Sequence, residues 1–486
     1  MCRVPALIAL GRITEGDVVT PERRAKRKLG MDDSMKLVNR MIWRVYGPAG
    51  KWKRFLCGLF VCMLVLGRAG GAVCAAKETE ELRLYATGAV LMDGESGRVL
   101  YGRNADEPMA MASTTKIMTC ILVLESVDGN EVAQVSSYAA SQPQVKLNVH
   151  KGEEYRVEDL LYSLMLESHN DSAVVLAEHV GGKEQDSGDN IADAGSRTPE
   201  ESKCAVGAFA EKMNEKAKEL GLTQTFFVTP NGLDGAVEWT NEKGETIRKE
   251  HMTTATELAR IMRYCILESP KAAEFLKITG TAHYSFSANR RFFSCSNHNA
   301  FLQMMEGMIS GKTGFTNKAG YCYVGALKRD GKVLVVALLA CGWPNHKTYK
   351  WSDTRTLMNY GLEKYEKRNI TEGSREYYEK ILKPIPVEGG RCENPEERAY
   401  VTPVVFEKPE ENQCTEVLMR EEEQVVRKCY LKQTLRAPVY AGSVVGKVDY
   451  CIGDEVWRQD LLVIEETVLR EDFLWHLERL LETFLL

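Results

Sequence analysis

The chain has 486 residues, of which 44% are hydrophobic and 27% are charged. This composition is typical of globular proteins and excludes a largely disordered, a collagen-like or a polytopic membrane protein. The net charge of −5 is uneven, with +9 in residues 1–76 and −14 in the rest, and so acidic a body argues against nucleic acid as the main partner.

The N-terminal segment has the pattern of a secretory signal peptide. Basic residues at 51–54 precede an apolar run at 55–66, and small residues follow the run. The run is shorter than the roughly 20 residues that a transmembrane helix needs. We therefore expect export to the cell envelope, with cleavage near Ala75 or Ala76. A lipoprotein signal ending at Cys74 and a buried helix are the alternatives for this segment.

Residues 77–368 show alternating helix and strand patterns and are predicted to form one domain. An apolar run at 333–340 lacks polar alternation, which predicts a central strand. The polar segment 181–203 is predicted to be a surface insertion. The predicted strands lie at 86–93, 98–103, 321–328 and 332–339, and the predicted helices at 114–127, 157–166, 172–180, 209–220, 254–267 and 354–365.

The residue pattern of the sequence changes after about residue 369. Six prolines separate short β-branched runs in residues 369–465, which predicts a small β-domain. Residues 466–486 are predicted to end the chain with an amphipathic helix, which has Leu and Phe on one face from residue 470 onward.

Ten cysteines follow the signal segment. They include no CxxC pair and no Cys/His spacing typical of a metal site, so we predict no metal and no cofactor. Export permits disulfides, but a chain of this size does not need them. We expect mostly free thiols, and the cysteines to check for a disulfide are Cys392, Cys414, Cys429 and Cys451.

The first of three short motifs, S-x-x-K, places Ser113 and Lys116 at the start of a predicted helix. Residues three apart share a helix face, with about 5–6 Å between their Cβ atoms, so the amine can reach the hydroxyl. A serine hydroxyl needs such a base to act as a nucleophile. A lysine can be that base when burial or a second cation lowers its pKa toward neutrality.

The second motif, S-x-N, lies between two predicted helices and offers the Ser168 hydroxyl and the Asn170 amide to a proton relay and a substrate backbone. The third, K-T-G, is predicted just before a strand. Lys312 supplies a cation, Thr313 a hydroxyl for a carboxylate, and Gly314 lets a substrate approach the backbone. Each motif is weak alone, so the inference depends on their order and their spacings of 55 and 144 residues.

With these motifs in this order, the chain resembles the serine D-alanyl-D-alanine carboxypeptidases, the low-molecular-mass penicillin-binding proteins. The resemblance covers about residues 84–368 and, more weakly, extends to about 465. It implies an α/β (α+β) catalytic domain like that of serine β-lactamases and penicillin-binding proteins, then a small all-β domain and a C-terminal amphipathic helix. Further matching segments are 112–119, 158–162, 170–171, 229–234, His251 with 253–255, 312–316 and 319–322.

The resemblance also implies a mechanism. Ser113 would attack the bond between the two terminal D-alanines of a peptidoglycan stem peptide and form an acyl-enzyme, with Lys116 as the base. Ser168 and Asn170 would relay protons and hold the peptide. β-Lactam antibiotics would acylate the same serine.

Substrate binding is implied in the same way. Lys312 and Thr313 would bind the terminal carboxylate, beside Gly314. The backbone N–H groups of Ser113 and Phe315 would form the oxyanion hole, where donors typically contribute about 3–4 kcal/mol each in the transition state.

Two features depart from the family pattern. His169 stands where the family usually has Gly, and we expect its side chain to face solvent. Glu200 and Glu201 follow the second motif near the place where a class A β-lactamase keeps its deacylating glutamate, but no E-x-x-L-N pattern surrounds them, so we expect a solvated loop. The alternatives are a β-lactamase-like hydrolase, disfavoured by that missing pattern, and a non-catalytic wall-binding module, disfavoured by three intact motifs.

The last helix has two interpretations. In the family such a helix often lies on the membrane surface, and the apolar face of residues 470–486 with Trp475 fits that role. However, acidic residues outnumber basic ones there, which suits anionic lipid poorly. Packing on the β-domain or on a partner is the alternative.

Overall fold

The computed structural model describes residues 81–185, 194–241, 244–392, 397–406 and 415–485. The predicted signal peptide and its cleavage site lie outside these residues. Among the described residues, no helix is both long enough and apolar enough to cross a membrane.

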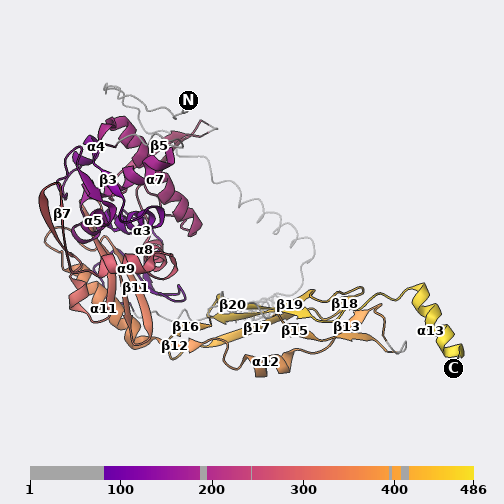
Figure 1. The fold of residues 1–486 in the computed structure, drawn as a ribbon. Helices are drawn as coiled ribbons and strands as arrows, with labels where there is room; N and C mark the ends of the chain where they lie inside the picture. Colours follow the sequence, from indigo (N-terminus) through magenta and orange to yellow (C-terminus); the bar gives the residue numbers. More distant parts are fainter. Residues whose placement is uncertain (1–80, 186–193, 242–243, 393–396, 407–414, 486) are drawn as a thin grey trace, which may run out of the picture. The chain divides into compact units, whose positions relative to one another are not determined.

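An antiparallel sheet lies at the centre of the domain that carries the three motifs (Figure 1). In the part of the chain that the structure describes, the strand order is β2-β1-β11-β10-β9, so β9 is at an edge. Strand β11 is buried along its whole length, which confirms the predicted central strand. The bounds are β1 Gly88–Asp93, β2 Val99–Arg103, β9 Met308–Thr316, β10 Gly320–Arg329 and β11 Lys332–Leu339.

Helices cover both faces of this sheet, which confirms the predicted fold class. Successive side chains of β11 point to opposite faces, so Val335 packs into the core beside α8 (Ala255–Arg263) and Val336 into the core beside α11 (Tyr349–Lys364). Helix α11 approaches the sheet closely at Gly361, where a Cβ would lie 2.8 Å from a Leu334 methyl.

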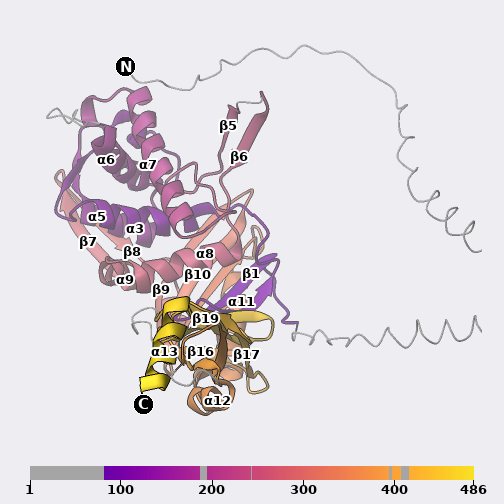
Figure 2. The same cartoon turned by 90° about the vertical axis from the view of Figure 1, so that its right-hand side faces the viewer.

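Most of the other helices of this domain pack around α3, which is buried from Lys116 to Leu124 (Figures 1 and 2), whereas α10 packs against β9. A helix that is apolar on nearly every side is expected inside the protein. The bounds are η1 Ala112–Thr115, α3 Lys116–Ser126, α4 Ser137–Ala140, α5 Val157–Tyr162, η2 Ser163–Glu167, α6 Asn170–Gln185, η3 Ala194–Ser196, α7 Pro199–Glu219, η4 Tyr264–Glu268, α9 Ala272–Gly280 and α10 Phe301–Met304.

The predicted insertion at 181–203 is wrong in its extent. Helix α6 continues to Gln185 and α7 begins at Pro199, while residues 186–193 lie outside the described ranges. Gly181 does not break α6, because it serves close helix packing: a Cβ there would lie 2.0 Å from the Ala205 carbonyl oxygen in α7. Glu201 is likewise no loop residue, since it forms a capping box with Thr198 at the start of α7.

Three short two-stranded elements were not predicted. The pair β5–β6 is exposed along most of its length and rich in charge, so it has no clear apolar alternation (Figure 2). The bounds are β3 Val132–Gln134, β4 Glu154–Arg156, β5 Ala236–Thr240, β6 Thr246–Glu250, β7 His283–Ala288 and β8 Arg291–Ser296.

The C-terminal region is rich in strands, and its largest sheet has the order β15-β20-β19-β17 among the described residues. Its core includes Val448, Tyr450 and Leu462. The sequence did not predict α12, whose charged residues mask its helical pattern. The bounds are β12 Glu366–Asn369, α12 Ser374–Ile381, β13 Ile385–Glu388, β14 Ala399–Val401, β15 Pro403–Val405, β16 Glu416–Met419, β17 Val425–Leu431, β18 Leu435–Arg436, β19 Val444–Ile452, β20 Glu455–Ile464 and α13 Phe473–Leu485.

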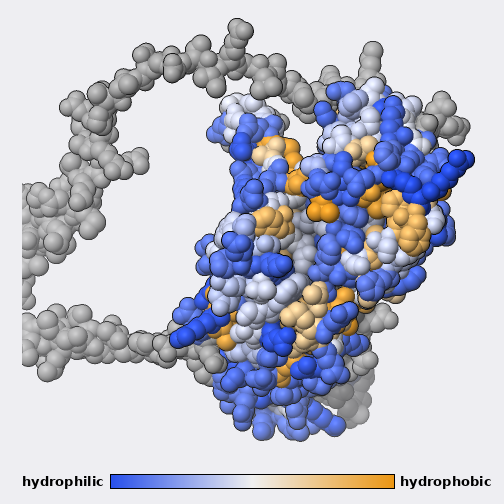
Figure 3. Space-filling model, turned by 90° about the vertical axis from the view of Figure 1, so that its left-hand side faces the viewer, coloured by the Kyte–Doolittle hydropathy of each residue, from blue (hydrophilic) through white to orange (hydrophobic). Residues whose placement is uncertain are grey.

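The surface and the thiols fit a polar exterior and an apolar core. On the face drawn in Figure 3, hydrophilic residues predominate and hydrophobic ones form separate patches. Three of the four cysteines considered for a disulfide lie within the described residues. Cys429 and Cys451 carry free thiols, and the Cys392 thiol donates to the Glu397 carbonyl. Cys414 lies outside the described residues.

The buried carboxyl of Glu178 in α6 generates a prediction about stability. Burial raises its pKa to about 7, although Ser136 donates to it at 2.8 Å. The folded state therefore binds more protons than the unfolded state between about pH 4.5 and 7, and stability falls as the pH rises through that window. Glu178→Gln, which removes the charge, should raise stability at pH 8 by on the order of 2 kcal/mol.

Urea unfolding at pH 5 and pH 8 checks this, with Glu211→Gln, an exposed glutamate in α7, as the control. The gain of Glu178→Gln should shrink toward pH 5. An equal effect of the substitution at both pH values would contradict the assignment.

Candidate active site

Ser113 lies in the single turn η1, directly before α3, so its hydroxyl stands at the N-terminus of a buried helix. Ala112 before it has a left-handed φ of +49°. Two hydroxyls fix the turn, because Thr114 Oγ1 donates to Met111 O at 2.6 Å and Thr115 Oγ1 donates to Ala112 O at 2.8 Å. The unusual backbone is therefore held by its own local hydrogen bonds.

The Lys116 amine is buried and contacts three oxygens. Its Nζ lies 2.8 Å from Ser113 Oγ, 2.9 Å from Asn170 Oδ1 and 2.6 Å from Asn231 O. Burial lowers the pKa of Lys116 well below 10.5, and the Lys312 cation lowers it further. A neutral amine has two N–H donors and one lone pair, so it can donate to the two Asn oxygens while its lone pair accepts the serine proton.

A glycine allows the Asn231 loop to reach this turn. Gly232 has a φ of +82°, and a Cβ there would lie 2.0 Å from the Ala112 carbonyl oxygen. Thr119 of α3 adds a second tie, because its hydroxyl donates to Pro230 O at 2.6 Å. The segment predicted as a loop is therefore in direct contact with the serine turn.

The second and third motifs meet across the same site. Lys312 Nζ donates to Ser168 Oγ at 3.0 Å and to Thr313 O at 2.9 Å. Burial lowers the pKa of Lys312 to about 7. The local sequence placed K-T-G just before a strand, whereas the family resemblance implied an edge strand that carries Lys312. The motif does lie inside the edge strand β9, which continues through Gly314 to Thr316.

The backbone of Gly314 faces the serine turn. A Cβ on Gly314 would lie 2.9 Å from Ser113 N and 3.0 Å from Thr114 N. The space beside the Ser113 N–H is thus open only because residue 314 has no side chain. An oxyanion placed there could accept from Ser113 N–H, with Phe315 N–H next along β9.

The expectation that His169 faces solvent is wrong. Its Nδ1 lies 2.8 Å from Ser163 Oγ, which in turn lies 2.8 Å from Ser172 Oγ. Burial lowers the pKa of His169, partly opposed by the charges of Asp171 and Glu167. The sequence could not show this contact, because it depends on Ser163 in the wide turn η2.

His251 was matched to the family pattern but given no role by the sequence. Its Nδ1 accepts from Val228 N–H at 2.9 Å, which leaves Nε2–H to donate to Thr115 Oγ1 at 2.7 Å. Burial lowers the pKa of His251 to about 3, so the ring stays neutral. Since the Thr115 hydroxyl in turn donates to Ala112 O, His251 stabilises the serine turn through Thr115.

Six of the eight predicted site residues line one cleft of about 630 Å³. The other two are buried lysines that contact cleft serines: Lys116 contacts Ser113, and Lys312 contacts Ser168. Lys350 of α11 also lines the cleft, and the sequence analysis missed it. Its Nζ lies 4.7 Å from the centre of the Tyr321 ring and 4.6 Å from that of Trp351. No short motif surrounds Lys350, so only the fold brings it to the site.

The family model for D-alanyl-D-alanine carboxypeptidase matches residues 75–187 and 201–341, which is more than half of the chain. The chain belongs to the D-alanyl-D-alanine carboxypeptidase family. The unmatched residues 188–200 fall within the segment that the sequence analysis treated as an insertion.

Individual relatives agree with this assignment. D-alanyl-D-alanine carboxypeptidase DacF of Bacillus subtilis is 29% identical over 66% of this chain and 75% of its own length. A D-alanyl-D-alanine carboxypeptidase of Mycobacterium tuberculosis is 30% identical over 56% of this chain and 81% of its own length. The crystal structure of penicillin binding protein 5 from Haemophilus influenzae has a TM-score of 0.56 at 22% identity, over 80% of this chain and 99% of that one, and shows the shared fold.

Gly314 generates a prediction about the acylation rate. Gly314→Ala should place a methyl beside the Ser113 N–H and slow acylation by a labelled penicillin by about 100-fold, the loss typical of one oxyanion donor. Gly207→Ala in α7 is the control, because a Cβ there meets nothing within 4 Å. A Gly314→Ala variant that acylates as fast as the wild type would contradict the placement of the oxyanion beside Ser113.

Proposed function

We propose that this D-Ala-D-Ala carboxypeptidase shortens peptidoglycan stem peptides through an acyl-enzyme on Ser113. The observation that supports this most directly is the 2.8 Å contact between Lys116 Nζ and Ser113 Oγ, with two further oxygens placed for the N–H groups of a neutral amine. The lowered pKa of Lys116 favours that neutral form.

In the first step Ser113 Oγ attacks the carbonyl carbon of the penultimate D-alanine, and its proton passes to Lys116 Nζ. The carbonyl oxygen becomes an oxyanion that accepts from the N–H groups of Ser113 and Phe315. When the peptide bond breaks, the protonated Lys116 returns this proton through Ser168 to the leaving nitrogen of the terminal D-alanine. Water then attacks the ester carbonyl and loses a proton to Lys116, and this proton passes to Ser113 Oγ as the ester bond breaks and the shortened peptide leaves.

The terminal carboxylate binds at the cationic end of the cleft, with Lys312, Thr313 and Lys350 as its partners. Burial holds the pKa of Lys312 at about 7 and that of Lys350 at about 8 in the absence of a carboxylate. A carboxylate beside these amines favours their charged forms, so substrate binding should take up protons near neutral pH.

Two rival functions share these residues. A β-lactamase-like hydrolase needs a base for fast deacylation, and Glu201, one of the two carboxylates considered from the sequence, caps α7 instead. A non-catalytic wall-binding module would not need a buried amine beside Ser113. Fast turnover of a penicillin would favour the first rival, and no release of D-alanine from a D-Ala-D-Ala peptide would favour the second.

Intact-mass analysis of the protein with and without penicillin tests the proposal. The wild type should gain one penicillin adduct that maps to Ser113. Ser113→Ala should lose both the adduct and D-alanine release, whereas Ser285→Ala, an exposed serine on β7, should keep both. An adduct retained at another residue in Ser113→Ala would refute the assignment.

The C-terminal helix is the proposed contact with the membrane surface after export. Phe473, Leu474 and Phe484 of α13 are 78%, 65% and 84% exposed. Trp475 does not belong to this surface as the sequence suggested, because it is only 7% exposed. Since acidic residues outnumber basic ones on the helix, apolar contact rather than charge would hold it to lipid.

Vesicle co-sedimentation tests this contact. The protein should bind vesicles of zwitterionic phosphatidylcholine with little dependence on salt, and Leu474→Glu should release most of it. Glu478→Gln is the control and should bind like the wild type. Binding that requires anionic lipid and disappears at high salt would contradict an apolar contact.

A further inference from the structure

The loop 143–150 forms one wall of the cleft and accepts every N–H of Asn170. Its residues Gln144 and Val145 line the cleft. Asn170 N donates to Val145 O at 2.8 Å, and Asn170 Nδ2 donates to Pro143 O at 3.2 Å and Gln144 O at 3.1 Å. The amide can therefore turn its Oδ1 only toward Lys116, so the position of this loop determines the partner of the catalytic amine.

Asp171 holds the loop from inside the protein. Its carboxylate accepts from the backbone N–H groups of Leu147 at 2.9 Å, Asn148 at 2.8 Å and Val149 at 3.2 Å. Asp171 is fully buried, and its oxygens are satisfied by these groups and by its neighbour Ser172. Three amides on one charged acceptor make a strong, directional contact.

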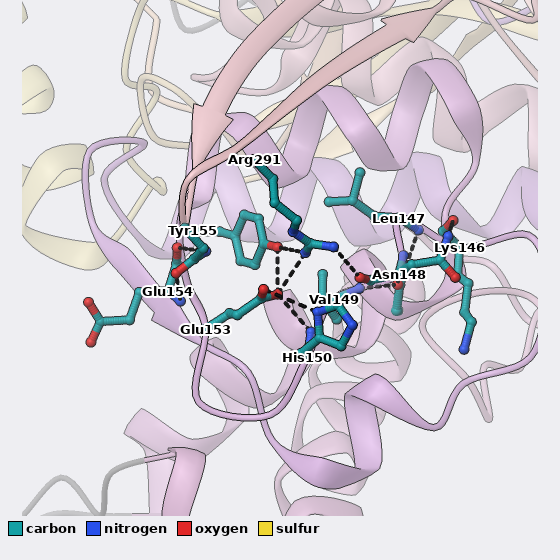
Figure 4. Close-up of polar contacts among 11 residues, drawn as sticks. Lys146, Leu147, Asn148, Val149, His150, Glu153, Glu154, Tyr155 and Arg291 are labelled. Atoms are coloured by element: carbon teal, nitrogen blue, oxygen red, sulfur yellow. Dashed lines mark hydrogen bonds and ion pairs between the residues drawn. The ribbon is translucent and has the colours of Figure 1, made fainter.

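Arg291 holds the same loop from the other side (Figure 4). It lies at the start of β8, and its Nη1 donates to Asn148 O at 2.9 Å. Its Nη2 donates to Glu153 Oε2 at 2.8 Å and to the Tyr155 hydroxyl at 2.6 Å. Asn148 is thus held at its N–H by Asp171 and at its carbonyl by Arg291.

Glu153 completes the outer contact. It accepts from Tyr155 OH at 2.8 Å and from His150 N at 2.7 Å, so it joins the end of the loop to β4 (Figure 4). The Arg291 guanidinium therefore contacts the loop in two ways. It donates directly to Asn148 O, and it binds Glu153, which accepts from His150 N at the end of the loop. The ring of Phe293 lies 4.8 Å from the Arg291 Cζ and limits its movement.

We propose that Arg291 is a positioning residue for acylation. By holding loop 143–150 against Asp171, it keeps the loop carbonyls where they orient Asn170, and Asn170 in turn orients Lys116 toward Ser113. This inference rests on the proposed role of Lys116 as the base. Arg291 itself touches neither the cleft nor the reacting atoms, so its effect is on geometry.

The test compares Arg291→Ala and Arg291→Lys with Arg290→Ala, which removes a charge from the exposed neighbouring residue of the same turn. Acylation by a fluorescent penicillin is followed in stopped flow at 10 °C, with folding checked by circular dichroism. Arg291→Ala should slow acylation about tenfold while the final adduct stays at one per protein, because a small displacement of a positioning group costs that much. Arg291→Lys should recover part of the rate, and Arg290→Ala should match the wild type.

The outcomes separate this inference from the proposed function. A folded Arg291→Ala variant with the wild-type rate, even one with a lower melting temperature, would overturn the positioning role and leave the enzyme mechanism intact. A wild type without an adduct on Ser113 would overturn both. If Arg291→Ala does not fold, Glu153→Gln replaces it, since it weakens the outer contact without emptying the space, and an unchanged rate there would equally overturn the proposal.

Discussion

A neutral amine buried beside a hydroxyl is the interaction on which this site depends. Burying an ammonium is costly, so the fold itself favours the deprotonated Lys116. The cost of burying the remaining N–H groups is limited because Asn170 and Asn231 accept them. These two acceptors come from separate segments of the chain. Gly232 and the loop 143–150 therefore serve to place Asn231 O and Asn170 Oδ1 beside Lys116 Nζ.

The edge position of β9 explains how a substrate can reach this amine. An edge strand leaves backbone N–H and C=O groups unpaired on one side, where an extended peptide can align. Gly314 keeps that edge close to the Ser113 N–H without filling the space between them. Lys312 on the same strand and Lys350 on α11 place two amines at one end of the cleft, where the proposed mechanism binds the terminal carboxylate.

The sequence could predict features that repeat along one element. The central strand β11 and the three motifs could be read because an apolar run and the spacing of Ser113 and Lys116 on one helix turn are local patterns. The roles of Gly181, His169 and Lys350 could not be predicted, because each depends on a neighbour distant in the sequence or on an irregular turn. Arg291 is the clearest case, since its partners Asn148, Glu153 and Tyr155 lie more than 130 residues earlier in the chain.

The backbone strain at the site explains why so many polar groups surround it. Ala112 and Ser168 both have left-handed φ angles, +49° and +68°, which non-glycine residues adopt only when neighbouring contacts hold them. His251 holds the first turn through Thr115, and Lys312 and the Ser163–His169 contact hold the second. Asn170 and Asp171 directly follow the second strained turn, so the helix start that orients Lys116 is also the place where the loop 143–150 is anchored. Part of the rigidity that keeps a serine, a lysine and an amide in register therefore comes from contacts such as His251–Thr115 and Ser163–His169, which the three motifs alone do not predict.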